Sequence, residues 1–386
     1  RFTGWNTAAN GTGTDYVAGA TLLMPVGGIT LYAKWVDANI VLTYDANGGV
    51  NAPPADTHTA NTSITLPGQA PTRSGYTFLG WTEASNNSGT VYSPSGAYTT
   101  PAGNGVLYAK WAIAVTLPTL AGHTVGALLW SDEFTGANGG LINDTNWTSR
   151  YCGHSAANGG GTCHNAEPQW YTPDAIRLDG SAQGNAVITT TRVSTPPTNA
   201  GQCMVGQCFY TSGRFDTQGK VSFQYGYIEA RMKMPVGGNN WPAFWALGDN
   251  ITNVGWPRSG EIDIAETGGN TPLRASSAIH FLNGGGGADY VYRELVNGTN
   301  YQNDFHTYGL AWTPNSMQLY VDRQLFWTVL PNNLNGVWSF NDPFFLILNN
   351  ATGGFGGNYD GWAKSYTTID YVRAWVLDGN GSVVKQ

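Results

Sequence analysis

Short stretches of alternating apolar and polar residues recur along the chain and predict β-strands rather than helices. In the stretch 278–281, Ile279 and Phe281 would point to one face of a strand and His280 to the other. The chain also contains 52 Gly and 19 Pro, which favour many turns between short strands. No apolar run reaches the roughly 18 residues expected of a membrane helix. The pattern therefore predicts an all-β protein without a membrane span.

The most informative pattern lies in the strand predicted at 261–266, which reads EIDIAE. Its two isoleucines would point into a core, while Glu261 and Asp263 share the other face. Strict alternation would place Glu266 on the core side, where an ionised carboxylate costs on the order of several kcal/mol. We therefore expect a one-residue bulge near Ala265 that returns Glu266 to the outer face. The three acids would then line one groove.

Crowded carboxylates of this kind suit a particular reaction. Retaining glycoside hydrolysis uses one ionised carboxylate as nucleophile and one protonated carboxyl group as acid, and a third acid nearby separates their pKa values. A solvated polar strand face is the alternative interpretation of an acidic alternation. Only 11% of the residues are charged, however, against about 25% in an ordinary soluble domain, so three acids within six residues stand out.

Aromatic residues and net charge narrow the class of ligand. The chain contains 15 Trp and 20 Tyr, and several Trp residues precede the acidic strand. Flat rings with a polar edge suit a carbohydrate, although a single Trp is more often part of a core. The net charge of −7, with only 18 Lys and Arg, lacks the basic footprint of a nucleic-acid-binding protein. It also disfavours a polysulfated galactan, so a neutral glucan is preferred.

The first 112 residues contain an internal repeat. Trp5 and Trp35 are 30 residues apart, as are Trp81 and Trp111, and the second pair lies 76 residues after the first. The second copy has an additional start that the first lacks, so residue 1 falls inside a repeat and the natural protein is expected to continue upstream. The predicted division is a partial repeat (1–36), a complete repeat module (37–112) and a larger catalytic unit (113–386).

Four cysteines lie in the larger unit as two close pairs, Cys152 with Cys163 and Cys203 with Cys208. An even number of cysteines in a loop-rich region favours two disulfides and an oxidising compartment. Zinc is the alternative, because two histidines adjoin the first pair, but neither spacing is that of a zinc ribbon. Of the three connectivities that four cysteines allow, the two local pairings are the simplest.

Several segments between residues 115 and 386 resemble, in order, the laminarinase branch of glycoside hydrolase family 16. They are residues 130–134, 225–231, 241–245, 260–266, 304–308 and 369–373. The resemblance implies a curved jelly-roll (concanavalin-like) β-sandwich and a retaining endo-β-1,3-glucanase. It makes Glu261 the nucleophile, Glu266 the general acid/base and Asp263 the residue that hydrogen-bonds the nucleophile. The bulged spacing resembles the β-1,3-glucanases rather than the unbulged bacterial mixed-linkage enzymes.

The resemblance also implies residues that contact the sugar chain. Asn165 and Arg214 match positions on the non-reducing side of the cleavage point. Three tryptophans complete the expected platform near that point: Trp241, Trp245 and Trp256. His280 is a candidate contact on the acceptor side, with a structural histidine as the alternative.

A structural calcium ion is a further implication of the resemblance. Its ligands would be Glu133, the carbonyl group of Gly184 and Asp370, because calcium prefers oxygen ligands. From the residues alone, Asp370 is an exposed acid at a strand edge. No organic cofactor is expected.

Residues 1–112 resemble the Listeria-Bacteroides (internalin B-type) repeats, β-grasp-like modules of bacterial surface and secreted proteins. A role as spacer or in cell-surface display is preferred over glucan binding, because a small module needs its aromatic residues for its own core. The chain is thus expected to be an extracellular, bacterial and monomeric enzyme that cleaves laminarin- or curdlan-type β-1,3-glucan. The alternatives are a mixed-linkage β-1,3-1,4-glucanase, a transglycosylase, a non-catalytic glucan-binding lectin and a cell-surface adhesin.

Overall fold

The computed structural model describes residues 1–35, 38–73, 76–86, 88–151, 167–181, 184–195 and 208–385. The chain forms two compact units, 1–116 and 117–386. The boundary between them lies close to the one predicted after residue 112. The predicted boundary between residues 36 and 37 lies outside the described residues.

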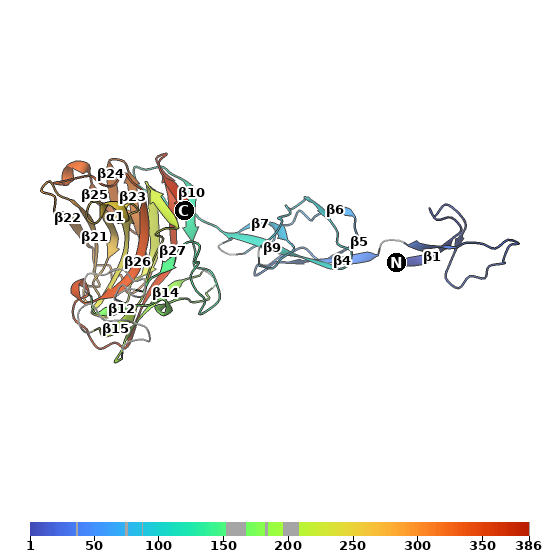
Figure 1. Ribbon diagram of the computed structural model, residues 1–386, viewed down its shortest axis with the longest axis horizontal. Helices are drawn as coiled ribbons and strands as arrows, with labels where there is room; N and C mark the ends of the chain where they lie inside the picture. Colours follow the sequence, from blue (N-terminus) through green and yellow to red (C-terminus); the bar gives the residue numbers. More distant parts are fainter. Residues whose placement is uncertain are drawn as a thin grey trace. The chain divides into compact units, whose positions relative to one another are not determined.

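Two largely antiparallel sheets pack face to face in residues 117–386 (Figure 1). The first sheet has nine strands, in the order β11 (Thr148–Ser149), β16 (Arg214–Asp216), β26 (Phe344–Thr352), β19 (Asn240–Gly248), β20 (Glu261–Glu266), β21 (Arg274–Leu282) and β22 (Ala288–Val296), with β17 (Val221–Gln224) pairing with β26 and with β28 (Ser382–Lys385).

The second sheet has ten strands, in the order β12 (Gln169–Tyr171), β15 (Tyr210–Ser212), β14 (Ala186–Arg192), β27 (Lys364–Leu377), β18 (Gly226–Lys233), β23 (His306–Thr313), β24 (Ser316–Val321) and β25 (Gln324–Val329), with β10 (Val125–Asp132) on β27 and β13 (Ile176–Leu178) on β14. The all-β prediction and the jelly-roll β-sandwich are confirmed.

The main core lies between these two sheets and follows the alternation of the strands. On β18, Ile228 and Met232 are buried against the core, and on β19, Phe244 and Ala246 face them from the other sheet. The residues that alternate with them, such as Glu229 and Trp245, point away from this core. Each sheet therefore has one apolar face, and the opposite face is free to carry polar side chains.

Helices are few and short in the described part of the chain. They are α1 (Ile251–Val254) and the 3₁₀ turns η2 (Pro173–Ala175), η3 (Pro331–Asn333) and η4 (Gly354–Gly356). None of the described helices is both long enough and apolar enough to span a bilayer.

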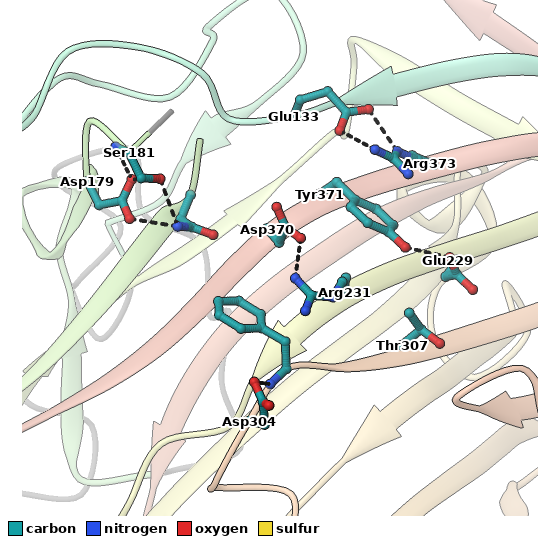
Figure 2. Close-up of polar contacts among 12 residues, drawn as sticks. Glu133, Asp179, Ser181, Glu229, Arg231, Asp304, Thr307, Asp370, Tyr371 and Arg373 are labelled. Atoms are coloured by element: carbon teal, nitrogen blue, oxygen red, sulfur yellow. Dashed lines mark hydrogen bonds and ion pairs between the residues drawn. The ribbon is translucent and has the colours of Figure 1, made fainter. Parts of the chain in front are cut away.

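The outer face of the second sheet carries a buried polar network around Glu229 (Figure 2). Glu229 is fully buried and accepts two hydrogen bonds from the guanidinium of Arg323, both at 3.0 Å. The hydroxyl groups of Tyr227 and Tyr371 also donate to its carboxylate, each at 2.8 Å. Because each carboxylate oxygen has partners, the cost of burying this charge is offset locally. The network connects β18 with β27 and with the turn between β24 and β25.

The N-terminal unit contains three small sheets. The complete repeat has a sheet in the order β5 (Asp56–Thr59), β4 (Asn39–Asp45), β9 (Gly105–Ile113) and β7 (Tyr76–Thr82), and a hairpin-like pair of β6 (Ser63–Thr65) and β8 (Ala97–Thr99). The partial repeat has β2 (Asp15–Tyr16), β1 (Phe2–Asn6) and β3 (Tyr32–Trp35). In the complete repeat, the first and last strands, β4 and β9, pair in parallel at the sheet centre. This arrangement agrees with the β-grasp-like prediction.

Candidate active site

A cleft of about 1270 Å³ crosses the exposed face of the first sheet, lined by residues of strands from β11 to β22. Strand register places its polar residues in rows that run across the sheet. One row joins Leu247, Glu261, His280 and Tyr290 on four successive strands. The cleft therefore runs perpendicular to the strands, with the predicted acids on β20 within it.

The bulge predicted near Ala265 is present. Asp263 lies opposite Trp245 on β19, whereas Ala265 lies opposite Phe244, so Ile264 is the additional residue between two consecutive pairs. The register towards β21 shifts at the same place. Ile264 and Ala265 are both buried in the core. Because two consecutive side chains are accommodated on the core side, the next residue returns to the cleft.

All three acids line the cleft, as the alternation and the bulge require. The indole N–H of Trp256 donates to Glu261 Oε2 at 2.7 Å, and the indole N–H of Trp241 donates to Glu266 Oε1 at 2.8 Å. Each of the two glutamates thus has its own tryptophan donor. These contacts fix the carboxyl groups and favour their ionised forms.

His280 lies beside the middle acid, with its Nε2 3.1 Å from Asp263 Oδ2. Single ligand-type atoms of Glu261, Asp263 and His280 lie within 4.8 Å of one another, a spacing that could also hold a metal ion. The short contact between the imidazole ring and the carboxyl group accounts for the proximity of His280 and Asp263. His280 faces the cleft, as the alternation in 278–281 predicts.

Burial is the main influence on the protonation of the three acids. It raises the pKa of Glu261 to about 8, and the negative charge of Asp263 adds to the effect. Burial, followed by the charge of Glu266, raises the pKa of Asp263 well above its ordinary value, and burial also raises the pKa of Glu266. The tryptophan donors and His280 lower the pKa values of the two glutamates. The cluster therefore retains protons at a pH at which isolated carboxylates would be ionised, which general-acid chemistry requires.

Arg214 and Trp245 lie on the side of the cleft towards β16. The guanidinium carbon of Arg214 is 4.9 Å from the centre of the Trp245 ring, and burial lowers the pKa of Arg214. The indole N–H of Trp245 donates to Asn349 Oδ1 at 2.7 Å, and the amide of Asn349 donates to the hydroxyl group of Tyr171 at 3.0 Å. The Trp245 ring is thus held in one orientation, as a stacking platform requires. Asn165 lies outside the described residues.

Some contacts and some lining residues of the cleft were not predicted from the sequence. Asn349 and Tyr171 orient Trp245 from strands distant in the sequence, and no local pattern indicates that contact. Tyr290 and Tyr292 on β22 also line the cleft, and here a signal exists. They alternate with Asp289 and Val291, so a period of two places both rings on one face of an amphipathic strand.

Of the positions predicted to bind calcium, Asp370 lies on β27 of the other sheet and Glu133 directly follows β10 (Figure 2). Both carboxylate oxygens of Glu133 accept hydrogen bonds from Arg373, at 2.9 and 2.7 Å, and Asp370 Oδ2 forms an ion pair with Arg231 at 2.5 Å. The Glu133 carboxylate is therefore already used. Its main-chain oxygen does suit the role, because a Cβ atom on Gly184 would lie only 2.3 Å from it. Asp370 would have to bind the ion in addition to its ion pair with Arg231, and the calcium site stays a prediction.

The predicted disulfides also stay predictions. Cys152, Cys163 and Cys203 lie outside the described residues. Cys208 is buried and packs with Trp170.

Comparison with known proteins identifies the family. The model for glycosyl hydrolases family 16 matches residues 170–373, and the Listeria-Bacteroides repeat domain matches residues 1–34 and 41–110. The chain belongs to glycosyl hydrolase family 16 and carries Listeria-Bacteroides repeats at its N-terminal side, as the sequence resemblance predicts.

Several relatives and solved structures are β-1,3-glucanases. A glucan endo-1,3-beta-glucosidase of Cryptopygus antarcticus is 35% identical over 273 residues, which cover 66% of this chain and 93% of that protein. Glucan endo-1,3-beta-glucosidase A1 of Niallia circulans is 32% identical over 67% of this chain, and the chain spans only 39% of that protein. The laminarinase catalytic domain of Thermotoga maritima superposes with a TM-score of 0.56 at 32% identity, covering 66% of this chain and 99% of that domain.

Two further relatives represent other specificities. An endo-1,3-1,4-beta-glycanase of Rhizobium meliloti is 29% identical over 66% of this chain and 52% of that protein. A beta-1,3-glucan-binding protein of Penaeus monodon is 35% identical over 44% of this chain and 63% of that protein.

Removing each tryptophan donor should move a different limb of the pH profile. Trp256→Phe removes a donor that lowers the pKa of Glu261, so the acid limb of kcat/KM, which requires ionised Glu261, should move to higher pH. Trp241→Phe removes a donor that lowers the pKa of Glu266, so the alkaline limb, which requires protonated Glu266, should move to higher pH. The measurement is kcat/KM on soluble β-1,3-glucan across pH.

Trp338→Phe is the matched control, because its indole N–H donates to the main-chain oxygen of Pro314 and not to an acid. Neither limb should move in this variant. If Trp241→Phe moved the acid limb and Trp256→Phe the alkaline limb, the roles of the two glutamates would have to be exchanged.

Proposed function

We propose that the protein is a secreted, retaining endo-β-1,3-glucanase that hydrolyses laminarin- or curdlan-type β-glucans. One observation carries the proposal: Glu261, Asp263 and Glu266 line one cleft, and each glutamate has a separate indole donor. A binding protein has no use for a proton-shuttling pair, so these acids argue against the lectin and the adhesin.

In the proposed reaction, the carboxylate of Glu261 attacks the anomeric carbon of the glucose unit in the cleft. Glu266 donates its proton to the glycosidic oxygen, the bond to the leaving chain breaks, and a covalent glycosyl-enzyme forms. Glu266 then accepts a proton from water, which attacks the same carbon and releases Glu261. Because two displacements occur at one carbon, the β configuration is retained.

Asp263 and His280 assist this reaction through Glu261. A hydrogen bond with Glu261 lowers the pKa of Asp263, and Asp263 lies 3.1 Å from His280. As Glu261 loses its charge to the sugar, the proton between Glu261 and Asp263 can shift towards Asp263. The pair thus adapts to a charge that changes during the reaction.

Cleavage within the chain is supported by the extent of the cleft. Strands β19, β26, β16 and β11 lie on one side of β20, and β21 and β22 lie on the other. Lining residues come from both sides, from Thr148 on β11 to Tyr292 on β22. A glucan chain can therefore continue in both directions from the acids, which is the arrangement that endo action needs.

Product analysis tests this function. The wild-type protein should release oligosaccharides from laminarin and curdlan, and NMR should detect the β-anomer first. A mixed-linkage β-1,3-1,4-glucanase, the alternative favoured by the Rhizobium meliloti relative, would prefer lichenan. A transglycosylase would yield products longer than the substrate. Initial release of the α-anomer would contradict the retaining mechanism.

Amide substitutions test the roles of the acids. Glu261→Gln and Glu266→Gln should each lower kcat by about 10²- to 10⁴-fold with the fold intact, because an amide can neither attack nor donate as an acid. Asp263→Asn should cause a smaller loss. Asp174→Asn, at an acid with 86% of its side chain exposed, should change nothing. If Glu261→Gln kept more than about a tenth of the activity, a loss under about 1.4 kcal/mol, the assignment would be wrong.

We also propose the structural calcium ion, held by the main-chain oxygens of Glu133 and Gly184 and by Asp370. Chelation should then lower the unfolding temperature, and added calcium should restore it. Without calcium, Asp370→Asn should unfold at a lower temperature than the wild type, because the ion pair with Arg231 is lost. Added calcium should no longer raise the unfolding temperature of this variant. An equal increment in the variant and the wild type, measured by calorimetry, would exclude this site.

The N-terminal repeats are proposed to be a spacer or cell-surface element of an extracellular, monomeric enzyme. A fragment containing residues 117–386 holds every described catalytic and predicted calcium residue, so it should fold and match the full chain on soluble laminarin. A spacer also predicts equal rates on insoluble curdlan. A loss on curdlan alone would show glucan binding by the repeats, because tethering matters most at a surface. A loss of activity on laminarin would contradict the assignment of catalysis to residues 117–386 alone.

A further inference from the structure

Strand β22 is the outermost strand of the first sheet, and it has an aliphatic face towards the core and an aromatic face towards the cleft. Val291 and Leu295 pack against the main core. The residues that alternate with them include Tyr290 and Tyr292, which are 58% and 56% exposed and line the cleft. Edge strands usually carry charged residues on their open face, because exposed apolar rings promote association. Two large rings here therefore require an explanation other than core packing.

Register connects these rings to the catalytic residues. Tyr290 pairs with His280, which pairs with Glu261, and Tyr292 pairs with Ala278, which pairs with Asp263. Neighbouring strands are roughly 4.7–4.9 Å apart, so the two rings lie on the order of 10 Å from β20. A glucose unit spans about one strand spacing along the cleft. The rings consequently lie where the second unit beyond the catalytic acids would be.

The rings form a continuous surface with His280. The His280 and Tyr290 rings are stacked, with centres 5.3 Å apart and planes at 28°, and the Tyr290 and Tyr292 centres are 6.3 Å apart. Trp256, which donates to Glu261, lies 6.1 Å from His280 on the other side. Ala278, next to Tyr292, has only a methyl group, which leaves the Tyr292 face open. A row of rings thus leads from the nucleophile to the sheet edge.

We infer that Tyr290 and Tyr292 form a carbohydrate platform, which binds the glucose unit two positions from the acids on the β22 side. The inference rests on the proposed glucanase function and names a binding site of that cleft. Tyr rings suit a sugar face, because they combine an apolar surface with a polar tip. With only two strands on this side of β20 and four on the other, the platform ends the cleft on the short side. It therefore sets where along a chain cleavage occurs.

The test compares a double variant, Tyr290→Ala with Tyr292→Ala, with the wild-type full chain on β-1,3-gluco-oligosaccharides of increasing length. We expect kcat/KM to fall about tenfold for oligosaccharides long enough to reach β22, and to stay unchanged for the shortest cleaved one. The position of cleavage in end-labelled substrates should also shift. The double variant with Phe at both positions should lose much less than the Ala variant, because the ring faces remain and only the polar tips are removed.

Tyr366→Ala is the matched control, because Tyr366 is 52% exposed on β27 of the other sheet, and it should change neither quantity. The inference would be overturned if kcat/KM of the double variant fell equally for oligosaccharides of every length. It would also be overturned if the unfolding temperature fell and kcat/KM showed no dependence on oligosaccharide length. Either result would show that the rings only stabilise the sheet edge. If the wild type cleaved no β-1,3-glucan, the proposed function would fail by itself. Calorimetric titration of the longest oligosaccharide into the wild type and the double variant would then test separately whether the two rings bind sugar. Equal affinities would refute the platform.

Discussion

The burial of three carboxylates on one strand is the constraint on which the first sheet depends. Neighbouring negative charges destabilise one another in a buried site. Protonation, hydrogen-bond donors and a histidine side chain must therefore offset their repulsion and the cost of their burial. The donors come from strand β19, from the segment before β20 and from β21, in the form of Trp241, Trp256 and His280. The same contacts that make the acids tolerable in the fold also hold them in the orientation that chemistry requires.

The bulge in β20 is what allows one strand to meet this constraint. Without an additional residue at Ile264, the third acid would face the core between the sheets. With it, Ile264 and Ala265 both contribute to the core, and Glu266 reaches the cleft opposite Ala243, a small neighbour. Core packing and the position of the acid are thus two consequences of one local irregularity.

Alternation and the cost of burying charge were sufficient to predict this irregularity from the sequence. The same reasoning placed His280 on the cleft face between two core residues. It could not predict which tryptophan donates to which glutamate. Trp241 reaches Glu266 through the register of β19 against β20, and Trp256 reaches Glu261 from the turn that precedes β20. Asn349 illustrates the limit: it fixes Trp245 through a partner, Tyr171, that lies 178 residues away. Cross-strand contacts of this kind follow from topology, which local patterns do not specify.

The aromatic residues of the N-terminal repeats differ from those of the cleft in what they contact. In the complete repeat, Trp81 is fully buried and Trp111 donates its indole N–H to the main-chain oxygen of Ala46 at 2.9 Å. Phe78 packs edge-on against both, with ring centres at 5.1 and 5.6 Å. These rings are therefore occupied by the module itself, as a small domain requires. Two of the cleft tryptophans, Trp241 and Trp256, direct their N–H groups to acids instead, and Trp256 has half of its surface exposed. The second unit contains both kinds of tryptophan. Trp312, in the core between the sheets, donates its indole N–H to the main-chain oxygen of Phe340, whereas Trp241 and Trp256 donate to acids that line the cleft.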